Sequence, residues 1–428
     1  MIGLTLVSLF LLALIAGMPL AVALGLASIT VLALAGFDQL AVPTNLYAGI
    51  AKYPLLAIPM FILAGMIFER SGVALRLVRF ISALVGEWTG SHAVVAVLVS
   101  MLLGGISGSG PADAAAVASV MLPSMVARGY PKGFSASLIA AAGSTAIIIP
   151  PSVAFIVYSV MVPAATVPAL FAAGLIPGAI AALCLLIPAI LISRRHGYGR
   201  ADRREPRPPL GKSFFEAIWG LLAPVIILGG LRMGLFTPTE AAVVAVVYGA
   251  FVGIVVYRSL DLKGLFRILI DAGELSAVVL MIIGIASVFA WAGNTLGIFD
   301  AAASMLVGFH SSPVLMLVSI NLLLLVAGMF LDAISIFLIL LPLLVPIAQA
   351  MGWDLVWFGV MMTINLAIGQ FTPPMALALM ITSRIAGIRM EETFRWVSWF
   401  VLAMGLGLAA LIVFPELVLW LPRRMGLG

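Results

Sequence analysis

The chain has 428 residues, of which 64% are hydrophobic and only 9% are charged, and its mean hydropathy is +1.25. No water-soluble core of ordinary size requires so apolar a composition, which excludes a soluble globular protein. A bilayer core about 30 Å thick takes about 20 apolar residues per helix, so the apolar runs that recur from end to end predict an all-α polytopic membrane protein.

The N-terminal 36 residues contain no Lys or Arg and stay apolar for longer than the core of a signal peptide. We therefore predict two short helices that turn near residues 16–20 (AGMPL), without a cleaved leader. An apolar crossing follows over about 48–68. The next stretch, 72–88, interleaves apolar residues with Arg76, Arg79 and Glu87, which predicts an amphipathic helix along the cytoplasmic interface.

A glycine-rich segment, GGISGSGPADAAAV at 104–117, interrupts the next apolar run. Its glycines permit a tight reversal, and Pro111 is placed to open a helix whose first turn contains Asp113. We predict that the segment enters and leaves the membrane on one side as a re-entrant hairpin. Its candidate sodium and substrate residues are Gly105, Ser107, Gly108, Ser109, Gly110 and Asp113.

Paired prolines then break an apolar segment at Pro150 and Pro151 (AIIIPPSVAF, 146–155). Proline lacks an N–H, so carbonyls one turn earlier, near Ala146 and Ile147, lose their helical partners. Unpaired backbone is tolerated at membrane depth only where protein or water surrounds it, so the break is predicted to face inward. Its carbonyls suit a hard cation such as sodium, and Ser144 and Thr145 complete this candidate set.

The same features return 223 residues later. Pro373 and Pro374 break a second apolar segment, which predicts freed carbonyls near Gly369 and Gln370, with Thr372 beside them. GMFLDAIS at 328–335 supplies the matching tip with Gly328, Asp332 and Ser335. A helix-capping role, which carboxylates at helix N-termini often have, is expected for Asp113. A site role is favoured for Asp332, because an ionisable group at membrane depth is expensive.

This offset predicts two copies of one unit, 1–192 and 217–428, joined by a polar, Arg- and Pro-rich cytoplasmic linker at 193–216. If each copy crosses the membrane five times, the second copy is inverted, as in secondary transporters whose interrupted segments mark the binding site. The positive-inside rule agrees: with the linker inside and both termini outside, all but four of the 22 Lys and Arg residues face inward. The net charge of +5 then reflects topology and gives no sign of nucleic-acid binding.

Other polar residues have simpler interpretations. Glu240 follows Pro238 at a predicted helix start, where we expect capping by Thr237 or Thr239. The three histidines stand at no ligand spacing, so sodium is the only metal and no further cofactor is expected. Because no Lys or Arg falls near the predicted midplane, an anionic substrate would be held by helix N-termini, hydroxyls and bound cations.

The motifs GGISGSGPADAAAVASVMLPSM, IIIPPSVAFIVYS, FTPTEAAVVAVVYG, GMFLDAISIFLILLPLLVPI and FTPPMALAL together resemble the large membrane subunit of tripartite ATP-independent periplasmic (TRAP) transporters. The resemblance runs along nearly the whole chain. It implies an elevator-type importer of organic acid anions, driven by a sodium gradient across the bacterial inner membrane. It also implies two partners besides the substrate and membrane lipid, a small four-helix membrane subunit and a periplasmic substrate-binding protein.

This sequence departs from the family pattern at Gly110, Pro111 and Ala378, where substrate contacts are expected to differ. A self-sufficient anion:sodium symporter without a binding protein is the alternative. A membrane enzyme is disfavoured, because no nucleophile, metal cluster or acid–base pair occurs at membrane depth.

Overall fold

The computed structural model describes residues 2–200, 209–299, 301–302, 304 and 312–427. The described residues are helical apart from short connections and contain no strand. Among them, eight helices are long and apolar enough to cross a membrane. The prediction of an all-α polytopic membrane protein is confirmed.

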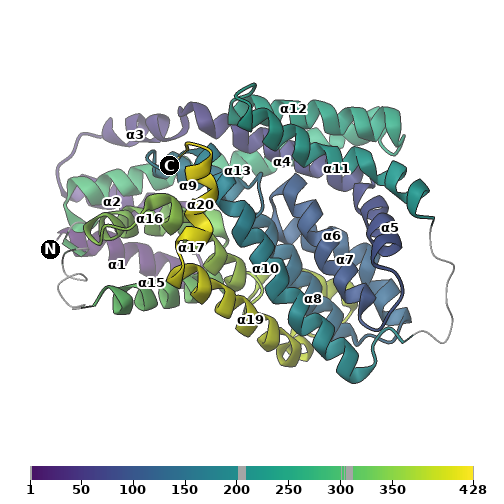
Figure 1. Cartoon of the computed structure of the whole chain (residues 1–428). Coiled ribbons are helices and arrows are strands. Elements are labelled where there is room, and N and C mark those ends of the chain that lie inside the picture. Colours follow the sequence, from purple (N-terminus) through teal and green to yellow (C-terminus); the bar gives the residue numbers. More distant parts are fainter. Residues whose placement is uncertain (1, 201–208, 300, 303, 305–311, 428) are drawn as a thin grey trace.

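The first part of the chain forms α1 to α10 (Figure 1). The predicted turn near 16–20 is confirmed, because it lies between α1 and α2. The elements are α1 (Ile2–Ile15), α2 (Leu20–Leu34), α3 (Ala41–Ile50), η1 (Tyr53–Leu56), α4 (Ala57–Arg70), α5 (Val73–Val85), α6 (Ser91–Ser107), α7 (Gly110–Ala127), α8 (Lys132–Ser144), η2 (Thr145–Ile147), α9 (Val153–Met161) and α10 (Val167–His196).

The rest of the chain repeats several of these lengths. Its elements are α11 (Leu210–Arg232), α12 (Pro238–Phe251), η3 (Val252–Val256), α13 (Leu262–Thr295), α15 (Pro313–Gly328), α16 (Ala333–Ala350), α17 (Leu355–Gly369), α18 (Leu377–Ala386), η4 (Met390–Thr393), α19 (Phe394–Val413) and α20 (Glu416–Arg424). Helix α10 continues into the predicted linker as far as His196, and α11 begins within it at Leu210. Residues 201–208 of that linker lie outside the described residues.

Helix boundaries in the two parts agree with the 223-residue offset. Helix α7 begins at Gly110 and α16 at Ala333, while α8 begins at Lys132 and α17 at Leu355. Both segments predicted as hairpins are pairs of helices with short turns, α6 with α7 and α15 with α16. Both proline pairs interrupt a helix, and the Pro150–Pro151 and Pro373–Pro374 bonds are cis.

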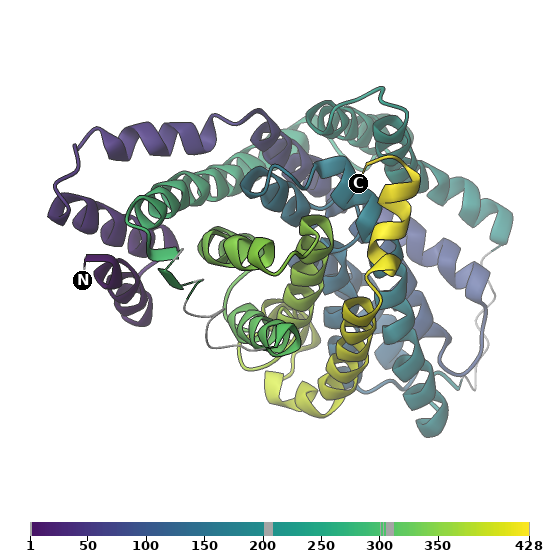
Figure 2. The same cartoon turned by 60° about the vertical axis from the view of Figure 1, so that its left-hand side comes forward.

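The helices divide into two groups by their contacts. We call α6–α10 and α15–α20 the core helices, and α1–α5 with α11–α13 the outer helices. Within the outer group α12 packs on α4, α13 on α2 and α3, and α11 on α5. In Figure 1, α3, α4, α11, α12 and α13 run along the top of the view, with α8, α10, α15 and α19 below them. Figure 2 shows α1 to α3 curving away from the core helices at the N-terminal side.

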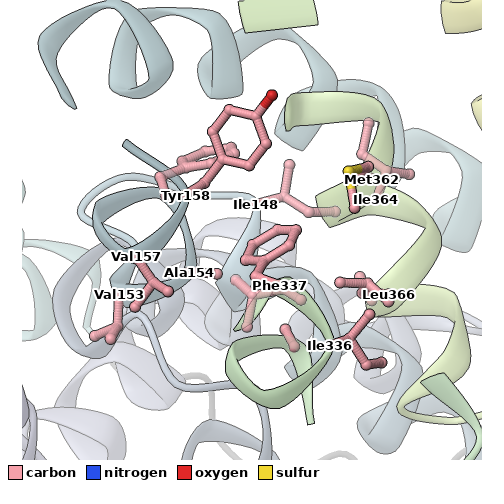
Figure 3. Close-up of a cluster of buried hydrophobic side chains, with 14 of the residues drawn as sticks. Ile148, Val153, Ala154, Val157, Tyr158, Ile336, Phe337, Met362, Ile364 and Leu366 are labelled. Carbon is pink, nitrogen blue, oxygen red and sulfur yellow. The ribbon is translucent and has the colours of Figure 1, made fainter. Parts of the chain in front are cut away.

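The two parts of the chain interlock within the core. Helix α9, which follows the first proline break, packs against α16 and α17, whereas α18, which follows the second, packs against α7 and α8. Figure 3 shows Tyr158 of α9 above Phe337 of α16. Their ring centroids are 5.5 Å apart in an edge-to-face arrangement, and the Tyr158 hydroxyl donates to the Leu355 carbonyl at 2.7 Å. Each broken helix therefore depends on the opposite hairpin for its packing.

This packing predicts a large effect at Phe337, whose side chain is fully buried. Phe337→Ala should lower the free energy of unfolding by about 3–5 kcal/mol, since truncating a buried aromatic leaves a cavity. Phe414→Ala, at a position 61% exposed, should change it by about 0.5 kcal/mol or less. Denaturant titration of the detergent-solubilised chain measures both. Equal decreases in the free energy of unfolding for the two variants would contradict the packing of α9 against α16 in the core.

Candidate functional site

The tip of the first hairpin packs in close contact with the backbone of the first proline break. Gly108, between α6 and α7, has a φ of +62°, and a Cβ placed on it would lie 2.3 Å from the Pro151 carbonyl oxygen. A Cβ on Gly104 would lie 2.7 Å from Cα of Ala146, and one on Gly105 would lie 3.6 Å from the Pro150 carbonyl oxygen. The absence of side chains at these glycines lets the hairpin tip approach the backbone of the break.

The second tip meets the second break in a related way. A Cβ on Gly369 would lie 2.7 Å from Cα of Gly328. The Ala376 N–H donates to the Met329 carbonyl at 3.1 Å and joins the tip to the end of the break. The candidate residues Gly328 and Gly369 are therefore brought together, as are Gly108 and Pro151 in the first half.

Gly110 connects the two halves of the site. A Cβ on this residue would lie 2.5 Å from Oε1 of Gln370 and 3.2 Å from Cα of Ser144. Gln370 Oε1 is buried and accepts no hydrogen bond from the described residues. The first tip, the first broken helix and the second break therefore converge at Gly110.

Asp113 is the buried carboxylate of this region. Its side chain is 2% exposed, and the Ser107 hydroxyl donates to its Oδ1 at 2.6 Å. The Ser107 oxygen in turn accepts from the Ser109 N–H at 3.2 Å. Oδ2 of Asp113 has no hydrogen-bond partner among the described residues. Ser109 occupies the N-cap position of α7, and Asp113 lies in the first turn of that helix as expected but forms no capping hydrogen bond.

Asp332 instead caps α16. Its Oδ2 accepts from the backbone N–H groups of Ile334 at 3.0 Å and Ser335 at 3.2 Å, and the Ser335 hydroxyl donates to Oδ1. Asp332 occupies the N-cap position, 223 residues after Ser109. The carboxylate preferred as a site residue from the sequence thus satisfies helix N–H groups. The expected cap at Thr237 is confirmed, with Glu240 completing a capping box.

A small pocket of about 80 Å³ lies between the first tip and the outer helices α4 and α13. Ser107, Ser109 and Asp113 line it from the hairpin, and Glu69 lines it from α4. No Lys or Arg is among the described residues that line it. Sequence reasoning missed Glu69, although an acid directly before Arg70 at the end of an apolar run was a visible signal. It could not show that this acid shares a pocket with Asp113.

Three carbonyls expected to be free at the breaks are hydrogen-bonded, which corrects that part of the prediction. The Ile147 carbonyl accepts from the Ser152 hydroxyl at 2.6 Å, and the Gly369 and Gln370 carbonyls accept from Thr372 N–H and Ala378 N–H, each at 3.0 Å. Hydroxyls and local turns re-satisfy backbone groups that proline frees within a membrane. A carbonyl oxygen has two lone pairs, so one acceptor position remains at each.

The candidate hydroxyls beside the breaks bond to their own helices. Ser144 donates to the Ala140 carbonyl at 2.8 Å, Thr145 to Ala142 at 2.6 Å and Thr372 to Ile368 at 2.6 Å. This back-bonding is common for Ser and Thr in apolar helices. Their side chains therefore support the broken helices in this conformation.

Asn365 is a second residue that sequence reasoning missed. It lies in α17, is 2% exposed, and donates through Nδ2 to the Asn321 carbonyl at 2.9 Å and to Asn321 Oδ1 at 2.8 Å. Its own Oδ1 has no partner among the described residues. An amide within an apolar run at membrane depth is a functional candidate, and that signal was present in the sequence.

Hairpins and interrupted helices that meet in the core of a helical membrane protein define a transporter architecture. The fold is similar to that of the Alcanivorax borkumensis YdaH transporter, with a TM-score of 0.66 and 16% identity, over 90% of this chain and 89% of that one.

Residues 6–417 match the family described as tripartite ATP-independent periplasmic transporter, DctM component, and the chain belongs to that family. It is 36% identical to the C4-dicarboxylate TRAP transporter large permease protein DctM of Rhodobacter capsulatus over 96% of both chains. It is 39% identical to the sialic acid TRAP transporter large permease protein SiaM of Vibrio cholerae, over 89% of this chain and 88% of that one. The chain is therefore the large permease component of a tripartite transport system and not an enzyme.

Proposed function

We propose that this chain imports organic acid anions across the bacterial inner membrane by coupling them to sodium, with both termini on the periplasmic side. The assignment of sodium as the coupling ion rests on one observation. Asp113 is buried, and one of its carboxylate oxygens has no hydrogen-bond partner among the described residues. The Ser107 hydroxyl donates to the other oxygen, and the hairpin tip that carries Ser107 packs against the break at Pro150 and Pro151. A buried carboxylate is costly unless it is paired, and unwound backbone with half-helix ends coordinates sodium in secondary transporters.

Relatives support a carboxylate substrate. The names of the two relatives above specify a C4-dicarboxylate and sialic acid, both organic acid anions. The N-terminus of α7 at Gly110 approaches Gln370 of the second break, and helix N-termini favour negative charge. The pocket of about 80 Å³ is small for such an anion and is of a size for an ion or water, so substrate binding would require the core and outer helices to separate.

The division into core and outer helices supports an elevator movement. The small pocket lies on that division, with Asp113 on a core helix and Glu69 on an outer helix. Sliding of the core helices as one block would carry the tips and breaks past α4 and α13. The substrate would arrive on a periplasmic binding protein, and a small four-helix membrane subunit would complete the assembly.

Reconstituted transport tests the proposal. We expect proteoliposomes with both membrane subunits and the binding protein to accumulate substrate under an inward sodium gradient. A tenfold gradient supplies about 1.4 kcal/mol per coupled ion, enough for about tenfold accumulation per ion. An equal potassium gradient should give only equilibration. Uptake of a radiolabelled C4-dicarboxylate and of sialic acid, each with its cognate binding protein, measures the effect.

Two outcomes would contradict separate parts of the proposal. Equal accumulation with sodium and potassium would refute sodium coupling. Equal uptake of free substrate without the binding protein would identify a self-sufficient symporter.

A further inference from the structure

A larger pocket of about 630 Å³ lies away from the hairpin tips, between α10, α11 and α20. In Figures 1 and 2 the C-terminal helix α20 lies beside α10, which it contacts. Phe171 of α10, Leu228 of α11 and Leu421 of α20 each line one wall. Its volume falls within the usual range for small-molecule sites, about 300–1,000 Å³, and the walls are mainly apolar.

Two arginines line this pocket. Arg232 is the last residue of α11 and Arg424 is the last residue of α20, and both are exposed and line the pocket. Neither forms an ion pair within the part of the chain that the structure describes, whereas the neighbouring Arg423 pairs with Glu416. No acidic residue is among the described residues lining the pocket. The arginines therefore present positive charge beside mainly apolar walls, with no acidic partner among the described residues that line the pocket.

An aromatic residue lies beside one of these arginines. The Arg424 guanidinium lies 5.8 Å from the ring centroid of Trp420, whose side chain is 51% exposed. Tryptophan is enriched at the level of the lipid head groups. The Arg424 guanidinium is therefore at a depth where a lipid phosphate can reach it.

We propose that this pocket binds one anionic phospholipid, with its phosphate between Arg232 and Arg424 and an acyl chain along the apolar walls. Basic pockets between transmembrane helices recognise anionic head groups. A small hydrophilic anion would leave polar atoms unpaired against Phe171, Leu228 and Leu421, which is unfavourable. An amphipathic anion matches both the two arginines and the apolar walls.

The bound lipid would lie between the two helix groups. Helix α11 contacts α5, α6 and α12, whereas α10 and α20 contact each other and α17. Pro224, which lines the pocket, also faces the first hairpin, because a Cβ on Gly105 would lie 3.8 Å from its Cβ. If the core slides as proposed above, this lipid would occupy the sliding boundary, but binding itself does not depend on that movement.

Native mass spectrometry of the purified full chain tests the lipid site. We expect the chain, mixed with equal phosphatidylglycerol and phosphatidylcholine, to retain one phosphatidylglycerol at collision energies that remove phosphatidylcholine. In Arg232→Gln/Arg424→Gln, retention should fall by about fivefold for each arginine removed. Gly229→Leu should also reduce retention. It fills the pocket without changing its charge, since Gly229 lines it and nothing lies within 4 Å of an added Cβ.

The matched control removes the same charge elsewhere. Lys263→Gln/Arg267→Gln alters exposed positions of α13 and should leave retention unchanged. Equal retention of the two lipids, or unchanged retention in Arg232→Gln/Arg424→Gln, would overturn the proposal. Displacement of the lipid by millimolar inorganic phosphate would also overturn it, because the pocket would then be a simple anion site.

Discussion

Asp113→Asn is expected to remove most sodium-dependent uptake, whereas Asp332→Asn should leave it nearly unchanged. Asp113 is buried, with one carboxylate oxygen unpartnered and no Lys or Arg lining its pocket among the described residues. A cation at this carboxylate would lose its charged ligand in the Asn variant. Hydrogen bonds to a charged group are worth about 1.5–3 kcal/mol, and a loss of that size corresponds to a roughly 10- to 150-fold weaker apparent sodium affinity.

Substitutions at Asp332 can be told apart from substitutions at Asp113, because Asp332 caps a helix and Asp113 does not. Asn is as good an N-cap as Asp, so Asp332→Asn preserves the cap of α16. Asp332→Ala should instead lower stability by about 1 kcal/mol with little change in sodium affinity. Initial uptake rates across a sodium series, together with thermal melting of each variant, measure both effects.

The reverse pattern would restore the site role that the sequence favoured for Asp332. If Asp113→Asn kept normal sodium dependence but shifted the pH dependence of uptake, the carboxylate would carry a proton and the sodium assignment would be wrong. Glu69→Gln adds a check from the opposite wall of the pocket. It should weaken sodium dependence if both acids face the same cation.

Local backbone chemistry made much of the fold predictable. Glycine and proline restrict or free the backbone where they stand, so GGISGSGPAD and the two proline pairs indicated the turns and breaks without knowledge of distant contacts. The 223-residue offset then related α7 to α16 and α8 to α17, whose first residues match it.

The roles of individual site residues were less predictable, because they depend on neighbours distant in sequence. Glu69 and Asp113 share a pocket, and Gln370 approaches Gly110 across the two halves of the chain. The capping contacts of Asp332 could have been found by a different route. The offset aligned Asp332 with Ser109, and both are N-caps, so capping could have been inferred from that alignment.

Gly108→Ala is expected to reduce uptake by about tenfold or more, because displacements near 1 Å at a functional site can cost about 100-fold. A methyl group on Gly108 would lie 2.3 Å from the Pro151 carbonyl oxygen, so the first tip would have to move off the break. The φ of +62° adds about 1–2 kcal/mol of backbone strain for a residue with a side chain.

Gly129 is the matched control for that strain. Its φ is +79°, but nothing lies within 4 Å of an added Cβ, so Gly129→Ala carries the backbone cost without the collision. Asn tolerates left-handed backbone better than Ala, so Gly129→Asn should behave almost as wild type. Gly108→Asn should remain defective, because its Cβ still meets Pro151. Uptake and melting temperature of all four variants separate backbone strain from collision with the Pro151 carbonyl. If Gly108→Asn restored transport, strain alone would explain the defect of Gly108→Ala, and close contact between the hairpin tip and the break would not be required.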